Sequence, residues 1–263
     1  MAGRLVVCPT PIGNLEDVTL RVLSALRDAD VVACEDTRRT RVLLDRFGVK
    51  ARLVSYHEHN EEARARELIQ RMRGGETVAL VSDAGMPLVS DPGFVLVREA
   101  VAAGMGVEVL PGPSAVLTAL VASGLPSARW RFEGFLPRKK GELEAILSAP
   151  ETIVAFESPR RLAKTLAAID PDREVAVCRE LTKLHEEVIR GAAKQLVERY
   201  AKEEPKGEIV IVIGPSERHE EATKEALDAV EELVAAGAKR RAAAHVIARL
   251  TGIRANSLYR PNS

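Results

Sequence analysis

TVALVSDAGMPLVSDPG, residues 77–93, joins an apolar run typical of a buried strand to a loop of turn-forming residues. The loop holds two aspartates, two glycines and two prolines. Such residues bend the backbone and hold it rigidly. Taken alone, the loop could be a phosphate cradle, a metal site, a structural turn or one wall of a ligand pocket.

The residues around this stretch repeat the same alternation of strand and helix. Apolar runs predict strands at Leu5–Cys8, Asp30–Cys34, Arg52–Ser55, Thr77–Ser82 and Val107–Leu110. Between them the spacing predicts helices near residues 19–28, 37–47, 60–73 and 93–103. Apolar strands separated by helices indicate right-handed βαβ units and a buried parallel sheet. We expect an N-terminal α/β lobe over residues 1–113.

The second half of the chain shows a different pattern of strands and helices. Strands are expected at Thr152–Phe156, Glu174–Cys178 and Glu208–Ile213, with helices near 142–147, 159–169 and 193–200. This predicts a second α/β lobe over residues 114–214, followed by a helical tail over 215–263.

Four loops at predicted strand ends read CPTPIGN, CEDTR, SDAGMP and PGPSA. In an open α/β sheet, ligands bind beyond the carboxyl ends of the strands, so these loops are expected to meet at one crevice. The fingerprints GxGxxG and GxxxxGK[ST] are absent. Asp83 and Asp91 have no histidine nearby, so we expect no metal. A ligand held largely by backbone groups is the remaining option.

Charge and cysteine content limit the partners. The 263 residues carry no formal net charge, but basic residues concentrate at 38–52, 129–140 and 239–260. This pattern fits patches for an anionic partner on a balanced body, although each patch could also be an ordinary solvated surface. Three widely separated cysteines predict buried thiols in a reducing compartment. Because neither a signal peptide nor a membrane span is recognisable, we expect a cytoplasmic protein without membrane contact.

Several motifs together resemble one family. LVVCPTPIGN, CEDTRRTRVLL, VSDAGMPLVSDPG, VLPGPSAVLTALVASGL, FEGFLPRKK, AFESPRRL and RELTKLHEEVIRG occur in order across residues 4–214. They resemble the RsmI family, S-adenosylmethionine-dependent 16S rRNA cytidine 2′-O-methyltransferases of the tetrapyrrole (corrin/porphyrin) methylase superfamily. That family usually has threonine where Met86 stands here.

The resemblance implies a two-lobed tetrapyrrole-methylase fold, with an N-terminal parallel sheet and a C-terminal mixed sheet. It also implies a homodimer with S-adenosylmethionine in the cleft between the lobes. Carried over position by position, the residues that contact the donor would be Pro9, Asp83, Ala84, Gly85, Leu88, Ser114, Ala115, Phe156 and Leu181. The acceptor would be a cytidine in the decoding region of 16S rRNA, within the 30S subunit.

Methyl transfer to a ribose hydroxyl benefits from a proton acceptor. Glu35, Asp36 and Glu157 are the hypothesised acceptors, because each stands beside arginine at a cleft-facing loop. For each, a solvated loop carboxylate is the alternative. Arginine binds phosphate in a bidentate manner, so Arg38 and Arg160 are expected to bind RNA phosphate. Further phosphate contacts are expected from four more basic residues: Arg39, Arg138, Lys139 and Lys140.

Two other functions remain open from the sequence. A methyltransferase acting on corrin or porphyrin precursors would use the same two lobes and the same donor. A non-catalytic ribosome-assembly factor could bind the donor without transferring its methyl group.

Overall fold

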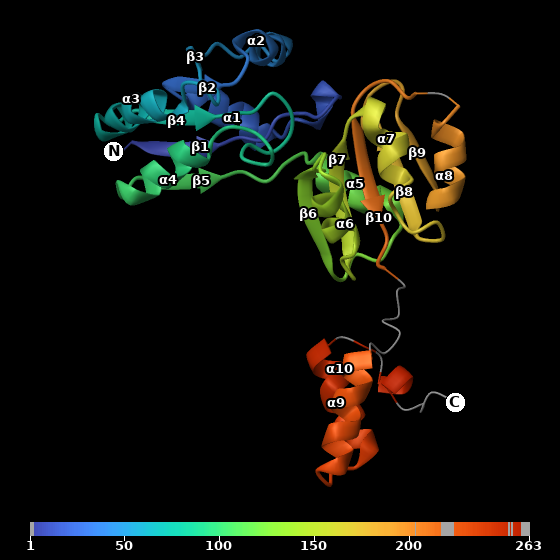
Figure 1. The fold of residues 1–263 in the computed structure, drawn as a ribbon. Helices are drawn as coiled ribbons and strands as arrows, with labels where there is room; N and C mark the ends of the chain where they lie inside the picture. Colours follow the sequence, from blue (N-terminus) through green and yellow to red (C-terminus); the bar gives the residue numbers. More distant parts are fainter. Residues whose placement is uncertain (1–2, 203, 217–223, 252, 254, 259–263) are drawn as a thin grey trace.

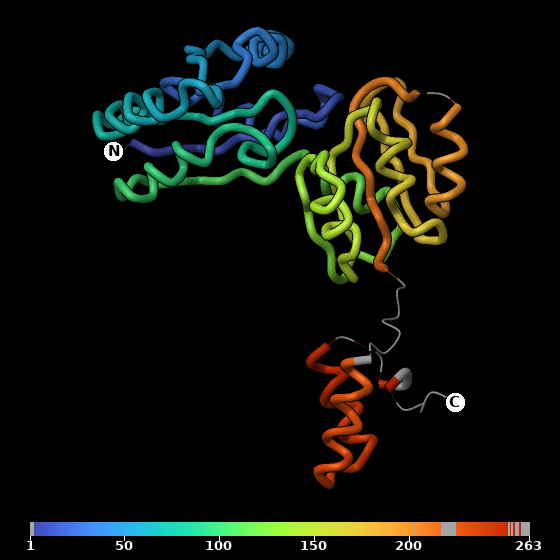
Figure 2. Tube along the Cα trace, viewed as in Figure 1, coloured from blue at the N-terminus to red at the C-terminus, as the bar shows by residue number. Residues whose placement is uncertain are grey.

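The computed structural model describes residues 3–202, 204–216, 224–251, 253 and 255–258. Within them the chain builds two α/β lobes and a short helical tail (Figure 1). Figure 2 follows the chain from the first lobe, in blue and green, into the second, in yellow and orange.

The first lobe has a parallel sheet of five strands in the order β3-β2-β4-β1-β5. The strands are β1 (Arg4–Val7), β2 (Val31–Cys34), β3 (Leu53–Ser55), β4 (Thr77–Leu80) and β5 (Gly106–Val109). The helical segments between them are η1 (Leu15–Asp17), α1 (Leu20–Asp28), α2 (Thr37–Arg46), α3 (Glu61–Arg73) and α4 (Phe94–Ala102).

Helices cover both faces of this sheet, as its continuous apolar strands require. Successive residues of a strand point to opposite faces. Leu5 and Val7 therefore pack with α3 and α4, whereas Val6 packs with α1 and α2. The parallel sheet predicted from the sequence is confirmed, with strand bounds within two residues of those expected.

The second lobe has a mixed sheet in the order β6-β7-β10-β8-β9, in which β6 and β7 are parallel and the other pairs antiparallel. Its strands are β6 (Trp130–Phe135), β7 (Thr152–Glu157), β8 (Glu174–Arg179), β9 (Glu187–Ala192) and β10 (Ile209–Ile213). Its helices are α5 (Ala115–Ser123), α6 (Lys140–Leu147), α7 (Pro159–Leu166) and α8 (Ala193–Tyr200). Helix α5 packs on one face of the sheet, and α6, α7 and α8 cover the other.

Strands β6 and β9 were not predicted from the sequence. Both are edge strands that carry charged residues and a glycine, so neither shows the continuous apolar run of a central strand. The predicted lobe boundary at residue 113 falls in the segment between β5 and α5.

The tail contains α9 (Lys224–Ala235), α10 (Arg240–Thr251) and η2 (Ala255–Leu258). Its apolar side chains, including Val230, Ala244 and Leu258, form a small core of their own. In the part of the chain that the structure describes, no helix is both long and apolar enough to span a bilayer. All three cysteines are buried and unpaired.

Candidate active site

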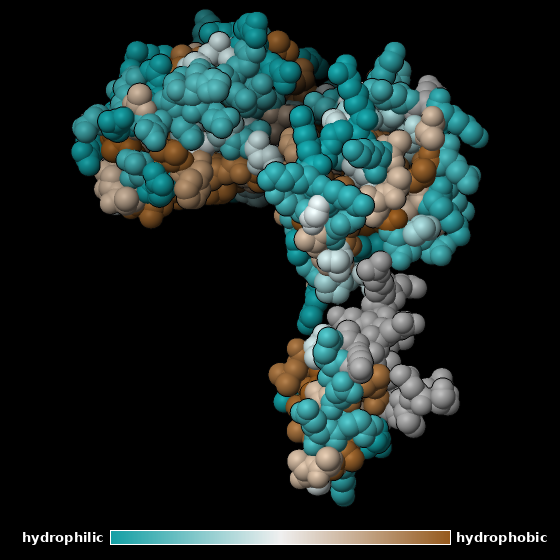
Figure 3. Space-filling view, viewed as in Figure 1, coloured by the Kyte–Doolittle hydropathy of each residue, from teal (hydrophilic) through white to brown (hydrophobic). Residues whose placement is uncertain are grey.

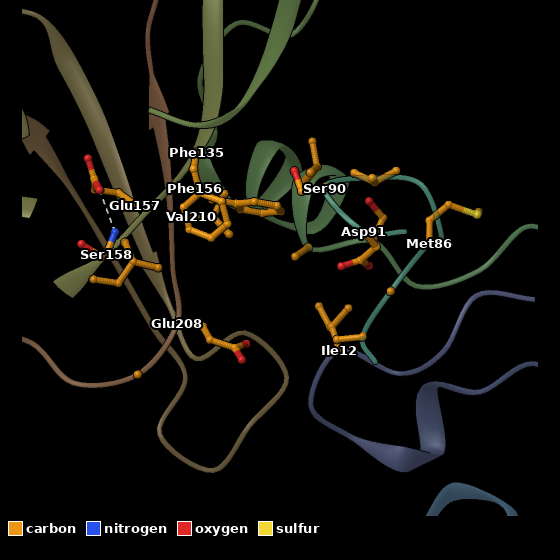
Figure 4. Close-up of a pocket in the computed structure, with 18 of the residues that line it drawn as sticks. Ile12, Met86, Ser90, Asp91, Phe135, Phe156, Glu157, Ser158, Glu208 and Val210 are labelled. Atoms are coloured by element: carbon orange, nitrogen blue, oxygen red, sulfur yellow. Dashed lines mark hydrogen bonds between the residues drawn. The ribbon is translucent and has the colours of Figure 1, made fainter. Parts of the chain in front are cut away.

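A cavity of about 380 Å³ lies between the two lobes. Figure 4 shows that the loop after β4 forms one wall, while β6, β7 and β10 form the opposite wall. The lining residues are Ile12, Ala84, Gly85, Met86, Val89, Ser90, Asp91, Ser114, Ala115, Val116, Phe135, Phe156, Glu157, Ser158, Pro159, Gly207, Glu208, Ile209 and Val210. Mostly apolar walls with a few polar groups are typical of small-molecule sites of this size.

The loop after β4 is fastened to the loop after β1. The backbone N–H of Thr10 donates to the carbonyl of Gly85 at 2.8 Å, and the N–H of Gly85 donates back at 2.9 Å. The Thr10 hydroxyl donates to the carbonyl of Ser82 at 3.0 Å. Gly85 has φ +80°, a conformation that favours glycine. The two loops therefore form one rigid wall of the cavity.

Backbone strain concentrates in loops at the ends of the two sheets. Within the described residues, positive φ occurs outside glycine at Leu88 (72°), Ser90 (65°), Glu180 (50°) and Thr182 (64°). The first pair belongs to the loop after β4, and the second to the turn after β8. Thr182 also joins the lobes, because its hydroxyl accepts the backbone N–H of Asn14 at 3.0 Å. Strain of this kind persists where the surrounding structure holds it and is common at functional sites.

Three carboxyl groups, those of Glu35, Asp83 and Asp91, lie near one another at the carboxyl ends of β2 and β4. Asp83 accepts the backbone N–H of Asp36 at 3.0 Å and pairs with Arg39 at 3.4 Å. Burial raises the pKa of Glu35, and the negative charge of Asp83 adds to that rise. Burial likewise raises the pKa of Asp91 to about 6, with a further contribution from Glu35. Asp91 is the member of this group that lines the cavity.

The sequence of the chain matches a family with this architecture. Residues 4–197 match the tetrapyrrole (corrin/porphyrin) methylases. The chain belongs to this family. Both the resemblance read from the motifs and the two-lobed α/β fold are confirmed.

Several relatives match most or almost all of the chain. A Mesorhizobium japonicum protein is 48% identical over 97% of this chain and 90% of its own length. A Thermotoga maritima protein is 45% identical, covering 82% of this chain and 100% of the relative. An Escherichia coli O157:H7 protein is 43% identical, covering 98% and 94%. All three are named ribosomal RNA small subunit methyltransferase I, and this chain, as a member of their family, is a methyltransferase.

Several solved structures share the fold. Uroporphyrin-III C-methyltransferase from Thermus thermophilus, complexed with S-adenyl homocysteine, has a TM-score of 0.57 at 23% identity, covering 81% of this chain and 97% of that one. Diphthine synthase has a TM-score of 0.62 at 18% identity, covering 81% and 90%. At these identities the likeness shows the fold alone.

The methylase motifs bring five of the nine predicted donor-binding residues to the cavity wall: Ala84, Gly85, Ser114, Ala115 and Phe156. The other four are not among the lining residues. Pro9 packs against Gly112, Leu88 packs against Gly93, and Leu181 is buried in the core beneath α5. The Asp83 carboxylate is directed at Asp36 and Arg39 rather than into the cavity.

The three predicted catalytic acids occupy different environments. Glu35 is one of the three neighbouring carboxyl groups, with Asp83 and Asp91, and it does not line the cavity. Asp36 caps α2 and pairs with Arg38 at 2.7 Å, and these bonds hold the pKa of Asp36 well below its usual range. Glu157 contributes to the lining, but its side chain is fully buried.

The buried Glu157 carboxylate has three polar partners. It accepts the Thr165 hydroxyl at 2.6 Å and the backbone N–H of Ser158 at 2.7 Å, and it pairs with Arg161 at 3.3 Å. Figure 4 shows the carboxylate turned toward Ser158, away from the cavity. This arrangement is that of a carboxylate that fixes the start of α7.

We therefore expect Glu157→Ala to lower the free energy of unfolding by about 2–4 kcal/mol, because three buried or half-buried donors lose their acceptor. Urea unfolding measures the effect. Glu144→Ala, which removes an exposed ion pair with Lys140, is the control, with an expected change below about 0.5 kcal/mol. Wild-type stability in Glu157→Ala would contradict this role.

The six predicted RNA-binding side chains are all exposed. Arg38 and Arg39 stand on α2, beside the carboxyl group cluster. Arg138, Lys139 and Lys140 lie at the turn from β6 into α6, and Arg160 lies in the first turn of α7. In the described part of the chain, no three Asp, Glu, His or Cys side chains are grouped so as to hold a metal ion.

Sequence reasoning did not select several residues of the cavity wall. Asp91 and Ser90 stand in the opening motif, and Phe135 stands in FEGFLPRKK, but the expectation there was centred on SDAGMP. The available signal for Asp91 was its place in the same loop, eight residues after Asp83. Ile12 and Val89 stand in two of the loops expected at the crevice, whereas Glu208 and Val210 offered no signal, because only the folded chain brings β10 to the cavity.

Proposed function

We propose that the chain transfers a methyl group from S-adenosylmethionine to the 2′-hydroxyl of a cytidine in the decoding region of 16S rRNA. The substrate is the 30S subunit, in the cytoplasm. The observation that carries the proposal is the 43–48% identity, over nearly the whole chain, to proteins named ribosomal RNA small subunit methyltransferase I.

The residues of the cavity fit S-adenosylmethionine. Gly85, Ala84 and Ala115 let the ligand approach the backbone closely, and Ile12 and Phe156 offer apolar surface for its adenine and methylene groups. When bound, S-adenosylmethionine supplies an electrophilic methyl group on a sulfonium centre. The chain's own task is to align the acceptor with that methyl group, which for well-oriented reactants contributes about 7–11 kcal/mol.

An aromatic side chain at the rim suits a nucleotide acceptor. Phe135 lines the cavity, yet 65% of its surface is exposed. Its ring packs against Phe156 with a centroid separation of 5.4 Å. An exposed ring beside a pocket can stack on a nucleobase, which typically contributes about 1–3 kcal/mol. Phe135 is therefore our candidate platform for the base whose ribose enters the cavity.

The exposed cations on α2 and at the start of α6 and α7 are the proposed phosphate contacts. Binding through phosphates weakens steeply as salt concentration rises. With only 3% aromatic residues, the chain is poorly suited to reading a long single strand by stacking. Recognition of the assembled 30S subunit by its shape follows from this composition.

A homodimer is part of the proposal. The edge strand β5 and helix α4 carry exposed apolar side chains, among them Phe94, Val101 and Val109. Figure 3 shows apolar surface gathered along the lower edge of the first lobe, where these elements lie. Apolar patches of this kind mark interaction surfaces. We expect sedimentation velocity to give twice the mass of the chain, and Val101→Lys to shift the protein toward monomer; a wild-type monomer would contradict the dimer.

The function is tested with purified protein, labelled S-adenosylmethionine and 30S subunits that lack ribose methylation. Mass spectrometry of the recovered 16S rRNA should locate one 2′-O-methylcytidine in the decoding region. Naked 16S rRNA should be methylated poorly. Methylation of a tetrapyrrole precursor instead would identify a corrin or porphyrin enzyme. Binding of S-adenosylmethionine and of 30S subunits without methyl transfer would identify an assembly factor.

A further inference from the structure

We propose that Asp91 accepts the proton of the acceptor hydroxyl, with Glu35 as a positioning residue behind it. The inference rests on the proposed function, because it assumes that the methyl acceptor is a hydroxyl group. It replaces the three acids expected from the sequence with one that the structure brings to the cavity wall.

The position of Asp91 is the first support. It lines the cavity on the side of the first lobe, across from Phe156 of the second lobe (Figure 4). It follows Ser90, whose backbone is held at φ 65° in a loop that is fastened to the loop after β1. Such a conformation costs free energy and is retained where the surrounding structure fixes it. The loop therefore presents Asp91 to the cavity in a defined orientation.

The surroundings of Phe135 agree with this placement. A Cβ atom added to Gly134, the residue before Phe135, would lie 3.5 Å from the Ser90 hydroxyl oxygen. The proposed base platform and the Ser90–Asp91 pair are thus neighbours across the junction of the lobes. Phe135 and Asp91 line the same cavity, so a nucleoside whose base stacks on Phe135 can place its ribose there.

The charges around Asp91 suit a proton acceptor. Burial raises its pKa to about 6, the negative charges of Glu35 and Asp83 add to the rise, and the nearby Ser82 hydroxyl opposes it. Asp83 is itself paired with Arg39. Across the cavity, Glu208 is paired with Lys183 at 2.9 Å. Among the described residues, no lysine or arginine forms an ion pair with Asp91. A base with a pKa near the working pH is the most effective proton acceptor.

The other cavity acids are occupied. Glu157 is held by Thr165, Ser158 and Arg161. Glu208 accepts from Lys183. Asp91 is the remaining carboxylate among the lining residues.

Methyl transfer and proton transfer together conserve atoms and charge. The acceptor oxygen forms a bond to the methyl carbon, while the carbon–sulfur bond of the sulfonium donor breaks and leaves its electron pair on sulfur. The acceptor O–H bond breaks, and its proton passes to the carboxylate of Asp91. A sulfonium, a hydroxyl and a carboxylate thereby become a thioether, a methyl ether and a carboxylic acid.

Asp91→Asn tests the proton acceptor. We expect kcat on 30S subunits to fall by about 10²- to 10⁴-fold, the usual contribution of a general base. The dissociation constant of S-adenosylmethionine, measured by calorimetry, should stay within about threefold of wild type. Asp28→Asn, at the exposed end of α1, is the matched control and should retain wild-type kcat.

Glu35→Gln tests the positioning residue through the pH dependence of kcat/KM. In the wild type, activity should rise through about pH 6 as Asp91 loses its proton. Removing the negative charge of Glu35 lowers the pKa of Asp91, so the acid limb should move to lower pH. A purely structural role for Glu35 would not move that limb.

A stability measurement checks the environment of Asp91 without any assay of activity. Folding raises the pKa of Asp91, so the stability linked to its protonated form is present at low pH and is lost as pH rises through about 6. Asp91→Asn should therefore melt at a higher temperature than wild type at pH 8, with a smaller difference at pH 4.

The outcomes separate the inference from the proposed function. If wild-type protein methylates 30S subunits and Asp91→Asn keeps kcat within tenfold, Asp91 is not the proton acceptor. An unmoved acid limb in Glu35→Gln removes the role of Glu35. If the wild type transfers no methyl group to 30S subunits, the proposed function itself fails, and the inference falls with it.

Discussion

Gly85→Val is expected to weaken the binding of S-adenosylmethionine by at least about 100-fold, which corresponds to about 2.7 kcal/mol. Gly85 lines the cavity and has φ +80°. A Cβ atom at this position would lie 3.3 Å from Cγ2 of Ile12, which stands in the loop after β1 and also lines the cavity. The branched side chain of valine would extend beyond that point and fill space that the donor needs. Calorimetry with the purified variant measures the loss.

Strain alone would also follow from a branched residue at positive φ, at a cost of about 1–3 kcal/mol in folding. Gly104→Val separates the two effects. Gly104 has φ +69°, close to that of Gly85, but nothing lies within 4 Å of an added Cβ atom. The control should lose a similar amount of stability and still bind the donor as wild type does. If Gly85→Val binds the donor with wild-type affinity, the cavity is not the donor site.

The sequence predicts the first lobe well because its central strands, β1, β2 and β4, are largely buried on both faces. Val31–Cys34 is apolar throughout, as is β4 after Thr77, and such runs leave few alternatives to a central parallel strand. The edge strands of the second lobe lack such apolar runs. Glu187–Ala192 begins with glutamate and contains arginine and glycine, so its pairing with β8 comes from tertiary context.

Only part of the candidate site was predictable from the sequence. Ala84, Gly85 and Ser114 were expected at the cavity because they stand in loops that the family motifs identify. The roles of the acids were not predictable, because a carboxylate's role depends on its partners. Glu157 and Asp91 look alike as acids in loop motifs, yet Thr165 and Arg161 occupy the first, whereas the second faces the cavity. Those partners come from helix α7, eight and four residues further on, and nothing in the sequence indicates how the side chains turn.

Arg173→Met is expected to lower the free energy of unfolding by about 3–4 kcal/mol. This is a large loss for one buried polar side chain. Arg173 is only 7% exposed. Its guanidinium donates to the carbonyls of Gly214 at 2.6 Å and Ala149 at 3.0 Å, and to that of Leu147. These carbonyls belong to the residue after β10, to the last residue of α6 and to the segment between α6 and β7. One side chain thus closes the end of the second sheet, and methionine would leave its acceptors without donors.

Thermal melting of three variants distinguishes this role from that of an ordinary arginine. At about 2–4 °C per kcal/mol for a protein of this size, Arg173→Met should melt roughly 10 °C below wild type. Arg173→Lys keeps the charge but offers a compact ammonium in place of the planar fork, so about half of the loss should remain. Arg199→Met removes an exposed pair with Glu187 at 3.0 Å and should change the free energy of unfolding by less than about 1 kcal/mol. Equal losses in Arg173→Met and Arg199→Met would mean that water replaces the guanidinium, and that the end of the second sheet is closed by its backbone pairing alone.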